Sequence, residues 1–367
     1  MLLLVQPASA QDRGAAMPSA VQHTEVRRIE QIAPYRPRFG RARPVIAVIG
    51  ENGGTELTDF VIPYSVLVRS GAADVLSVAT EPGIMQMRPA LRIKPAATMA
   101  QFDVRYPDGA DYVIVPAVVN SDSQRLQAWV ADQGAKGATM VSICDGAFVV
   151  AKAGLLKGKQ ATAHWATHGE RTKHFPDTAW QINARYVADG RAVSSAGISA
   201  ALPTSLALVE AIAGHDKAAA LAQELGVNEW GAQHDSEIFH PHFGVNLRAH
   251  LTRFTNPWFH ARQQVGVPLS NGMDDIALAL TMDAWSRTGR SRAVALGEPS
   301  ATVQTHDGLT VMPDTQTSSR EPDQMLAPLV GVLPGKVLGQ VLDSIANAYG
   351  RRTAYRVALD LEYPEYH

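Results

Sequence analysis

The chain has 367 residues, of which 46% are hydrophobic and 19% charged, enough for two globular domains of ordinary size. Its net charge of −2 argues against a strongly basic DNA-binding protein, so we expect no nucleic-acid partner. A single cysteine, Cys144, excludes an intramolecular disulfide and leaves the redox compartment undetermined.

The first residues, "MLLLVQPASAQDR", resemble a truncated signal peptide. A short apolar run precedes Ala8-Ser9-Ala10, which fits the small-residue rule for signal-peptidase cleavage before Gln11. We therefore expect a periplasmic or secreted protein. The alternative is a cytoplasmic protein with an unstructured, leucine-containing tail.

Residues 11–43 lack hydrophobic periodicity and are rich in arginine and proline. This composition is typical of a linker or an extended arm, so we assign residues 1–43 to a leader. Its basic side chains would lie near an anionic membrane surface or simply be solvated.

From Pro44 the pattern changes to short apolar runs that alternate with helical segments. Continuous apolar runs are typical of strands buried on both faces of a parallel sheet. The pattern predicts a flavodoxin-like, doubly wound α/β domain over residues 44–215. The expected strands are 45–50, 74–80, 91–95, 111–117 and 138–143, the expected helices are 57–71, 123–137, 146–156 and 200–214, and a hairpin is expected at 184–197.

Cys144 lies where the strand 138–143 meets the helix that begins near Gly146. In a wound parallel sheet, ligands bind at the carboxyl ends of the strands, and a strand–turn–helix junction is the geometry of a nucleophile elbow. A helix N-terminus favours a thiolate, so we expect the pKa of Cys144 to lie below its usual value. The other interpretation is a small buried hydrophobic residue.

The stretches "CDGAFVVAKAGLLKGKQATAHW" (144–165) and "SSAGISAALPTSLALVEAI" (194–212) resemble the ThiJ/PfpI superfamily of the class I glutamine amidotransferase-like fold. The first is most similar to the branch that contains isonitrile hydratases and the sensor domains of AraC-type regulators. The resemblance covers about residues 44–215. It implies a cysteine nucleophile assisted by an acidic residue four positions before a proline, which here is Asp59 before Pro63.

The physical role of Asp59 would be to share a proton with the sulfur, because two neighbouring negative charges repel each other. Glu56 is the alternative acid, since it lies three residues earlier on nearly the same helix face. The resemblance also places His164 near the cysteine, where it would orient substrate, act as a base, or be a structural histidine bonded to backbone.

Two positions depart from the family pattern. Peptidase-like members have a histidine directly after the cysteine, whereas this chain has Asp145, which we interpret as a helix-start acid lining the pocket. Relatives often have glycines after the strand that ends at Pro116, whereas this chain has Ala117 and Val118. We expect an oxyanion hole of backbone N–H groups near Ala117, Val118 and Gly146, in a loop less free to adopt positive φ.

Short motifs of the first domain recur about 218 residues later in the same order. "RSG" at 69–71 returns as "RTG" at 287–289, and "LRIKP" at 91–95 as "LTVMP" at 309–313. This predicts an internal repeat, a degenerate half-copy of the fold over 263–367. Its expected helices are 274–287 and 336–349, and its expected strands lie near 293–296, 309–312, 330–333 and 354–362. Glu362 stands at the position that corresponds to Cys144, so the copy lacks the nucleophile.

Residues 216–262 form a connector rich in histidine and aromatic residues, which we expect to pack on a domain. Histidine and carboxylate side chains suit zinc, but their spacing here matches no strong metal motif, so we predict no metal site. The histidines and acids concerned are His234, Asp235, Glu237, His240, His242 and His250.

The sequence thus predicts a cysteine-dependent enzyme of hydratase or hydrolase type, acting on a small electrophilic molecule through Cys144 and Asp59. No glycine-rich phosphate motif is evident, and we expect no cofactor. The alternative is a non-enzymatic redox or small-molecule sensor that uses the same pocket. A small-molecule substrate is the expected partner, and self-association stays open.

Overall fold

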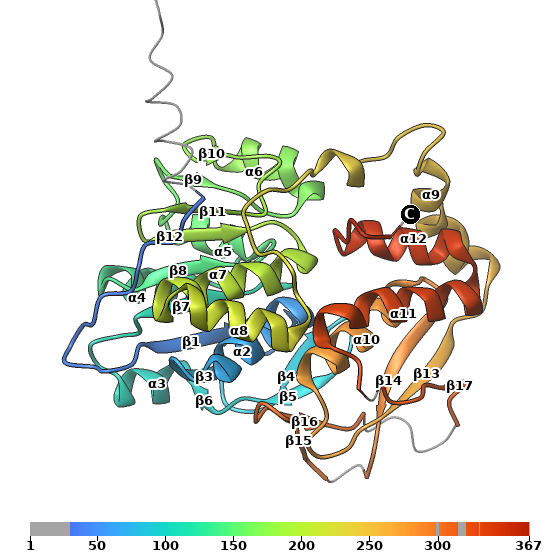
Figure 1. The fold of residues 1–367 in the computed structure, drawn as a ribbon, viewed down its shortest axis with the longest axis horizontal. Helices are drawn as coiled ribbons and strands as arrows, with labels where there is room; N and C mark the ends of the chain where they lie inside the picture. Colours follow the sequence, from blue (N-terminus) through green and yellow to red (C-terminus); the bar gives the residue numbers. More distant parts are fainter. Residues whose placement is uncertain (1–29, 299–300, 315–320, 330, 367) are drawn as a thin grey trace, which may run out of the picture.

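The computed structural model describes residues 30–298, 301–314, 321–329 and 331–366, so the expected signal sequence lies outside the described residues. Its largest sheet has seven strands in the order β11-β12-β8-β7-β1-β3-β6 (Figure 1). All neighbours are parallel except β11 and β12, which form the expected hairpin. The strands are β1 (Val45–Gly50), β3 (Asp74–Ala79), β6 (Ala97–Thr98), β7 (Tyr112–Val115), β8 (Thr139–Ser142), β11 (Tyr186–Asp189) and β12 (Ala192–Ser195).

Helices cover both faces of this sheet, because its strands are apolar on both sides (Figure 1). In β1, Ile46 and Val48 face one core cluster, whereas Val45 and Ile49 face the other. The predicted flavodoxin-like α/β fold is confirmed. One face carries α2 (Leu57–Ser70), α7 (Ala201–Ala213) and α8 (His215–Leu225), and the other carries α3 (Met99–Arg105), α4 (Gln124–Ala135) and α5 (Gly146–Lys152).

The described part of the expected leader, residues 30–43, is held against the domain. The Tyr35 N–H donates to the Ala211 carbonyl at 2.8 Å, and Arg41 forms an ion pair with Asp111 at 2.9 Å. Arg38 donates to two backbone carbonyls of the turn after α4. Of the two expectations, a linker or an extended arm, this stretch therefore fits the extended arm, because several of its side chains have partners on the domain surface.

The second half of the chain repeats the order of elements that begins the first domain. A strand, a helix, a strand and two short strands succeed one another at the expected spacing of about 218 residues. The repeated elements are β13 (Gln263–Pro268), α10 (Asp275–Arg287), β14 (Ser291–Leu296), β15 (Val303–Gln304) and β16 (Thr310–Met312), which keep the order of β1, α2, β3, β4 (Met85–Arg88) and β5 (Arg92–Lys94).

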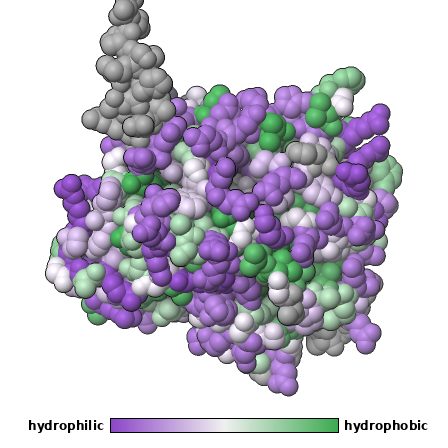
Figure 2. All heavy atoms as spheres, viewed as in Figure 1, coloured by the Kyte–Doolittle hydropathy of each residue, from purple (hydrophilic) through white to green (hydrophobic). Residues whose placement is uncertain are grey.

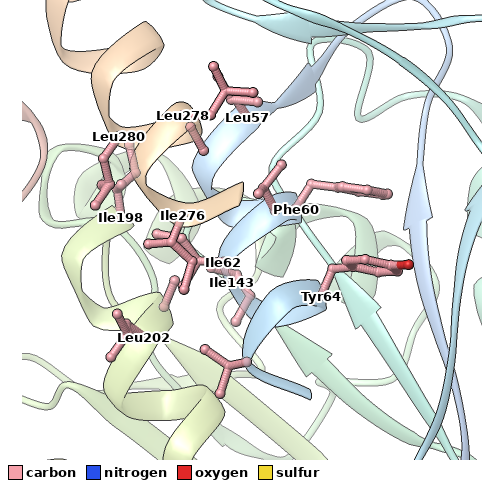
Figure 3. Close-up of a cluster of buried hydrophobic side chains, with 14 of the residues drawn as sticks. Leu57, Phe60, Ile62, Tyr64, Ile143, Ile198, Leu202, Ile276, Leu278 and Leu280 are labelled. Carbon is pink, nitrogen blue, oxygen red and sulfur yellow. The ribbon is translucent and has the colours of Figure 1, made fainter. Parts of the chain in front are cut away.

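The two repeated regions meet edge to edge and helix to helix. Strands β5 and β16 pair antiparallel, with Ile93 opposite Val311 and Lys94 opposite Thr310. Residue 311 is the counterpart of residue 93, so the pairing is reciprocal, like that of two copies related by a two-fold axis. Alongside, α2 packs against α10, and their apolar side chains form one core (Figure 3).

Two arginines form reciprocal ion pairs across this contact between the two regions, which we call the seam. Arg69 of α2 contacts Asp274 at 2.7 Å and Asp307 at 2.8 Å. Its counterpart 218 residues later, Arg287 of α10, contacts Glu56 at 2.6 Å. Since Glu56 and Asp274 are also counterparts, each region supplies the cation for the other region's acid.

The end of the repeat differs from the prediction. The expected strand 354–362 is wrong, because this segment forms α12 (Arg351–Asp360), which packs on α11 (Pro334–Tyr349). Here Ala354, Val357, Ala358 and Leu361 are buried at helical spacing. Residues 331–333 are not a strand either. The place beside β13 is taken by β17 (Gln324–Met325) in a three-stranded sheet, β14-β13-β17.

The connector packs on the first domain only in part. Phe239, in the short helix η3 (Glu237–Phe239), is buried, and the Trp230 indole donates to Glu210 at 2.6 Å. In contrast, Phe243, Phe254, Trp258 and Phe259 are exposed, three of them on α9 (Leu247–Phe259). In the described part of the chain, no helix is long and apolar enough to cross a membrane.

Candidate functional site around Cys144

Cys144 forms a sharp turn between β8 and α5. Its φ of 54° lies in the left-handed region, which non-glycine residues rarely adopt and which is typical of a strained functional position. The backbone can pass this point only because residue 146 is glycine, since a Cβ there would lie 1.9 Å from the Val115 carbonyl oxygen. The strand–turn–helix junction that the sequence predicted is thus present.

The thiol itself differs from the prediction. Cys144 is only 6% exposed, and burial is the main reason why its pKa lies well above its usual value. The carboxyl groups of Asp59, Asp145 and Glu362 raise this pKa further. The expected lowering of the Cys144 pKa is therefore wrong, because burial and nearby acids outweigh the seven-residue helix α5 behind the cysteine.

Asp59 lies in the first turn of α2 and is completely buried. Its Oδ2 accepts the Ala117 N–H at 3.2 Å, whereas its Oδ1 is buried without a hydrogen-bond partner. Burial raises the pKa of Asp59 well above its usual range, which favours the protonated carboxyl group. This group forms no hydrogen bond to the Cys144 sulfur in the described structure, and its Oδ1 is open to a new partner.

The alternative acid, Glu56, forms an ion pair at the seam between the two regions instead. It precedes α2 and binds Arg287, the cation supplied by the second region. Burial raises its pKa well above the usual value, against the opposing effect of Arg287. The structure therefore brings Glu56 to the inter-region ion pair and leaves Asp59 as the acid with a free oxygen.

His164 is held by backbone groups through both ring nitrogens. Its Nδ1 accepts the Ala166 N–H at 3.2 Å, and its Nε2 lies 3.2 Å from the carbonyl oxygen of Asp360. In the neutral ring, this arrangement places the proton on Nε2, which donates to that carbonyl. This arrangement favours the structural role over that of a base.

The expected oxyanion donors are mostly occupied. The Ala117 N–H donates to Asp59, and the Gly146 N–H donates to the Ile143 carbonyl at 2.9 Å. The bridge between Val118 and Thr55 is made by the N–H groups of Val119 and Glu56, so the Val118 N–H has no acceptor among the described residues. The same holds for the N–H of Asp145, which comes directly after Cys144, the position of an oxyanion donor in a nucleophile elbow. These two N–H groups are the remaining donors, while the Asp145 side chain accepts from the Thr167 hydroxyl at 2.7 Å.

Sequence reasoning missed the role of Glu362. This carboxylate, completely buried, accepts the N–H groups of Gly197 and Trp165, each at 2.8 Å. His234 Nε2 lies 3.3 Å from the Oε2 of Glu362. His164, His234 and the Trp165 N–H together hold the pKa of Glu362 below its usual value, although burial opposes this. Glu362 comes directly after α12, so the second region inserts an ionised group beside the loops that surround the thiol.

The fit around Glu362 is close. A Cβ on Gly197 would lie 2.6 Å from the Glu362 Cδ, so only glycine fits at residue 197. No local sequence pattern predicts the contact between Gly197 and Glu362, because 165 residues separate them along the chain. The repeat placed Glu362 opposite Cys144 in an alignment, which says nothing about their distance in space.

A cavity of about 350 Å³ opens at the seam of the two regions. Its walls include Ile62, His234, Leu280 and Tyr363, and Cys144 is not among them. His234 therefore stands between this cavity and the buried carboxylate of Glu362. The described residues contain no group of three metal-ligating side chains, and the connector histidines instead contact aromatic rings, backbone and Glu362.

Comparison with known proteins agrees with this geometry. The DJ-1/PfpI family model matches residues 45–211. The isonitrile hydratase of Pseudomonas putida is 30% identical over 166 residues, which cover 44% of this chain and 68% of that protein. The chain belongs to the DJ-1/PfpI family. The family match covers the seven-stranded domain and leaves the repeated second region outside it.

Solved structures of DJ-1/PfpI relatives resemble the same half of the chain. DJ-1beta of Drosophila melanogaster has a TM-score of 0.46 and 24% identity, over 51% of this chain and 99% of that one. An AraC family transcriptional regulator of Pseudomonas putida has a TM-score of 0.44 and 16% identity, over 49% of this chain and 98% of that one. At these values the likenesses carry no functional argument.

Proposed function

We propose that this DJ-1/PfpI protein is a cysteine-dependent enzyme of hydratase or hydrolase type that acts on a small, uncharged electrophile. The observation that carries this proposal is the strained turn at Cys144 together with a buried acid, Asp59, whose Oδ1 has no partner and whose charge raises the pKa of the thiol. A nucleophile needs a partner that moves its proton, and a neutral carboxyl group with a free oxygen can do so. The neighbouring acids Asp145 and Glu362 disfavour an anionic substrate.

The chemistry can be written for an isonitrile, the substrate class in the name of the Pseudomonas putida relative. The Cys144 sulfur attacks the terminal carbon, which takes up a proton from Asp59, while the Asp59 carboxylate takes the proton that the thiol loses, and a thioimidate forms. Water then adds to the same carbon and the C–S bond breaks, so the thiol regains its proton and an N-substituted formamide leaves. The net reaction adds one water, and no oxidant or cofactor is consumed.

The buried thiol supports a second candidate, a redox or small-molecule sensor. A thiol that is 6% exposed with a raised pKa is largely protonated at neutral pH and hard to reach. In this function, opening of the pocket would expose the sulfur to an oxidant, which would convert it to sulfenic acid.

Turnover of small isonitriles and 2-oxoaldehydes tests the proposal. We expect the full chain to convert at least one of them, Cys144→Ser to abolish conversion, and Asp59→Asn to lower kcat by roughly 100-fold or more, the usual contribution of a general acid. Glu56→Gln is the matched control, because that acid binds Arg287 and should leave kcat within a few fold. Full turnover in the Cys144→Ser variant would rule out covalent catalysis. No turnover, together with peroxide-dependent oxidation of Cys144 by mass spectrometry, would favour the sensor.

A further inference from the structure

The most exposed apolar surface among the described residues lies on the connector. Its members, called here the α9 surface, come from helix α9 and the loop before it, and Figure 1 places α9 at an edge of the molecule beside α12. Large apolar side chains this exposed in one segment indicate an interaction site. The α9 surface consists of Phe243 (93% exposed), Val245 (72%), Leu251 (49%), Phe254 (67%), Trp258 (86%) and Phe259 (74%).

Helix α9 is anchored by its opposite face. Ala249, Thr252 and Asn256 are buried, and the Asn256 amide donates to the Thr288 carbonyl at 2.9 Å and to the Thr353 hydroxyl at 3.2 Å. Leu251, Phe254 and Trp258 succeed one another at spacings of three and four, so they lie along one side of the helix. The helix therefore has two distinct faces. A face of small and polar side chains packs on the protein, and a face of large apolar side chains is exposed to solvent.

The segment that carries this face has charged side chains of one sign. Residues 238–273 contain no aspartate or glutamate, although the whole chain has a net charge of −2. The same stretch carries Arg248, Arg253 and Arg262, all exposed. In Figure 2, apolar side chains appear among hydrophilic ones at the edge where Figure 1 draws α9.

We propose that the α9 surface binds an anionic lipid surface. Tryptophan and phenylalanine insert at the boundary of headgroups and acyl chains, while arginines beside them bind lipid phosphates. A second copy of the chain fits less well, because a two-fold interface through the same face would bring like-charged arginines together. This surface is separate from the Cys144 site, so the proposal does not depend on the proposed catalysis.

Flotation of the full chain with vesicles tests the proposal. We expect binding to phosphatidylglycerol/phosphatidylcholine vesicles, weaker binding to pure phosphatidylcholine, and loss of binding at high salt. Phe254→Ser/Trp258→Ser should lower the partition coefficient about tenfold or more, because it removes two inserted rings. Arg248→Gln/Arg253→Gln should reduce binding to anionic vesicles and leave the weak binding to neutral ones unchanged.

The matched control is Val104→Ser/Ile182→Ser, which removes exposed apolar side chains elsewhere (85% and 53% exposed) and should bind as the parent chain does. Unchanged circular dichroism confirms that each variant is folded. The proposal is overturned if the parent chain does not float with anionic vesicles, or if the control loses as much binding. It is also overturned if the aromatic substitutions instead abolish a concentration-dependent dimer seen by analytical ultracentrifugation.

Discussion

The two repeated regions of this chain share a framework and differ in the elements that come after it. After β1, α2 and β3–β5, the first region continues through β7 and β8 to the strained turn at Cys144. After the matching β13, α10 and β14–β16, the described residues of the second region add β17 to its small sheet and then form α11 and α12. The repeated parts build the seam between the regions, and the parts that differ build the site.

Individual positions show the same division. The seam residues Glu56 and Arg69 have like-charged counterparts in Asp274 and Arg287, so both regions keep their ion-pairing groups. The candidate catalytic acid Asp59 has the counterpart Ala277, which cannot move a proton. The second region thus keeps the groups that hold the halves together and lacks the carboxyl group that we propose to act on the thiol. Three sets of substitutions test this contrast.

The largest effect is expected at the reciprocal arginines. Arg69→Met leaves Asp274 and Asp307 without their cation, and Arg287→Met does the same to Glu56 and Asp283. Removal of one partner of a buried ion pair costs about 3–5 kcal/mol, with the larger loss expected for Arg69, whose side chain is 7% exposed against 23% for Arg287. Urea unfolding of each variant measures its loss of unfolding free energy.

Arg125→Met is the control for the two arginines. Its ion pair with Glu81 is exposed on both sides, so its loss should change the unfolding free energy by less than about 0.5 kcal/mol. A large loss for only one of the two seam arginines would show that the two ion-pair sets are not equivalent.

The next effect concerns pH and Asp275, which takes the place that Leu57 holds in the first region. Burial, with the nearby charge of Asp307, raises the pKa of Asp275 to about 7, against about 3.9 in an unfolded chain. Asp275 therefore does not reduce the free energy of unfolding below pH about 4, where it is protonated in both states. The free energy of unfolding falls as the pH rises towards 7, because the unfolded chain loses this proton first. Asp275→Asn removes this dependence, so the variant should gain several kcal/mol relative to the parent between pH about 4.5 and about 7.5.

Urea unfolding of parent and variant at the two pH values measures this gain. Parent and variant both contain Asp307, so the contribution of Asp307 to the pH dependence of the unfolding free energy largely cancels in their difference. A stability difference that stays constant with pH would mean that Asp275 is already ionised in the folded chain.

The smallest effect is expected where the second region reaches the thiol. Glu362 stays ionised at neutral pH and helps to raise the pKa of Cys144, so Glu362→Gln should lower that pKa. Iodoacetamide labelling of the single cysteine should shift to lower pH and become severalfold faster at pH about 8. Glu365→Gln, an exposed acid three residues later, is the control and should label as the parent does. An unchanged labelling profile in a folded Glu362→Gln variant would contradict this electrostatic role.

The sequence predicted the wound sheet well, because its strands are apolar on both faces and its helices have clear periodicity. It also placed Cys144 at a strand–helix junction and Asp59 on the first helix of the domain, since local pattern and family resemblance agree there. The last repeat segment was predicted as a strand because the repeat aligns 354–362 with the strand before Cys144, but its buried side chains recur at helical spacing. With β17 already beside β13 in the small sheet, this segment packs as a helix on α11.

The sequence by itself determined the framework, the repeat and the junction that carries the sulfur, because these depend on residues close together along the chain. Only the tertiary structure decided the state of the thiol, since burial and the approach of Glu362 depend on contacts between residues far apart. It also decided which acid is free. Glu56 and Asp59 stand one helical turn apart, and Arg287, more than 200 residues away, binds the first and leaves an oxygen of the second unpaired.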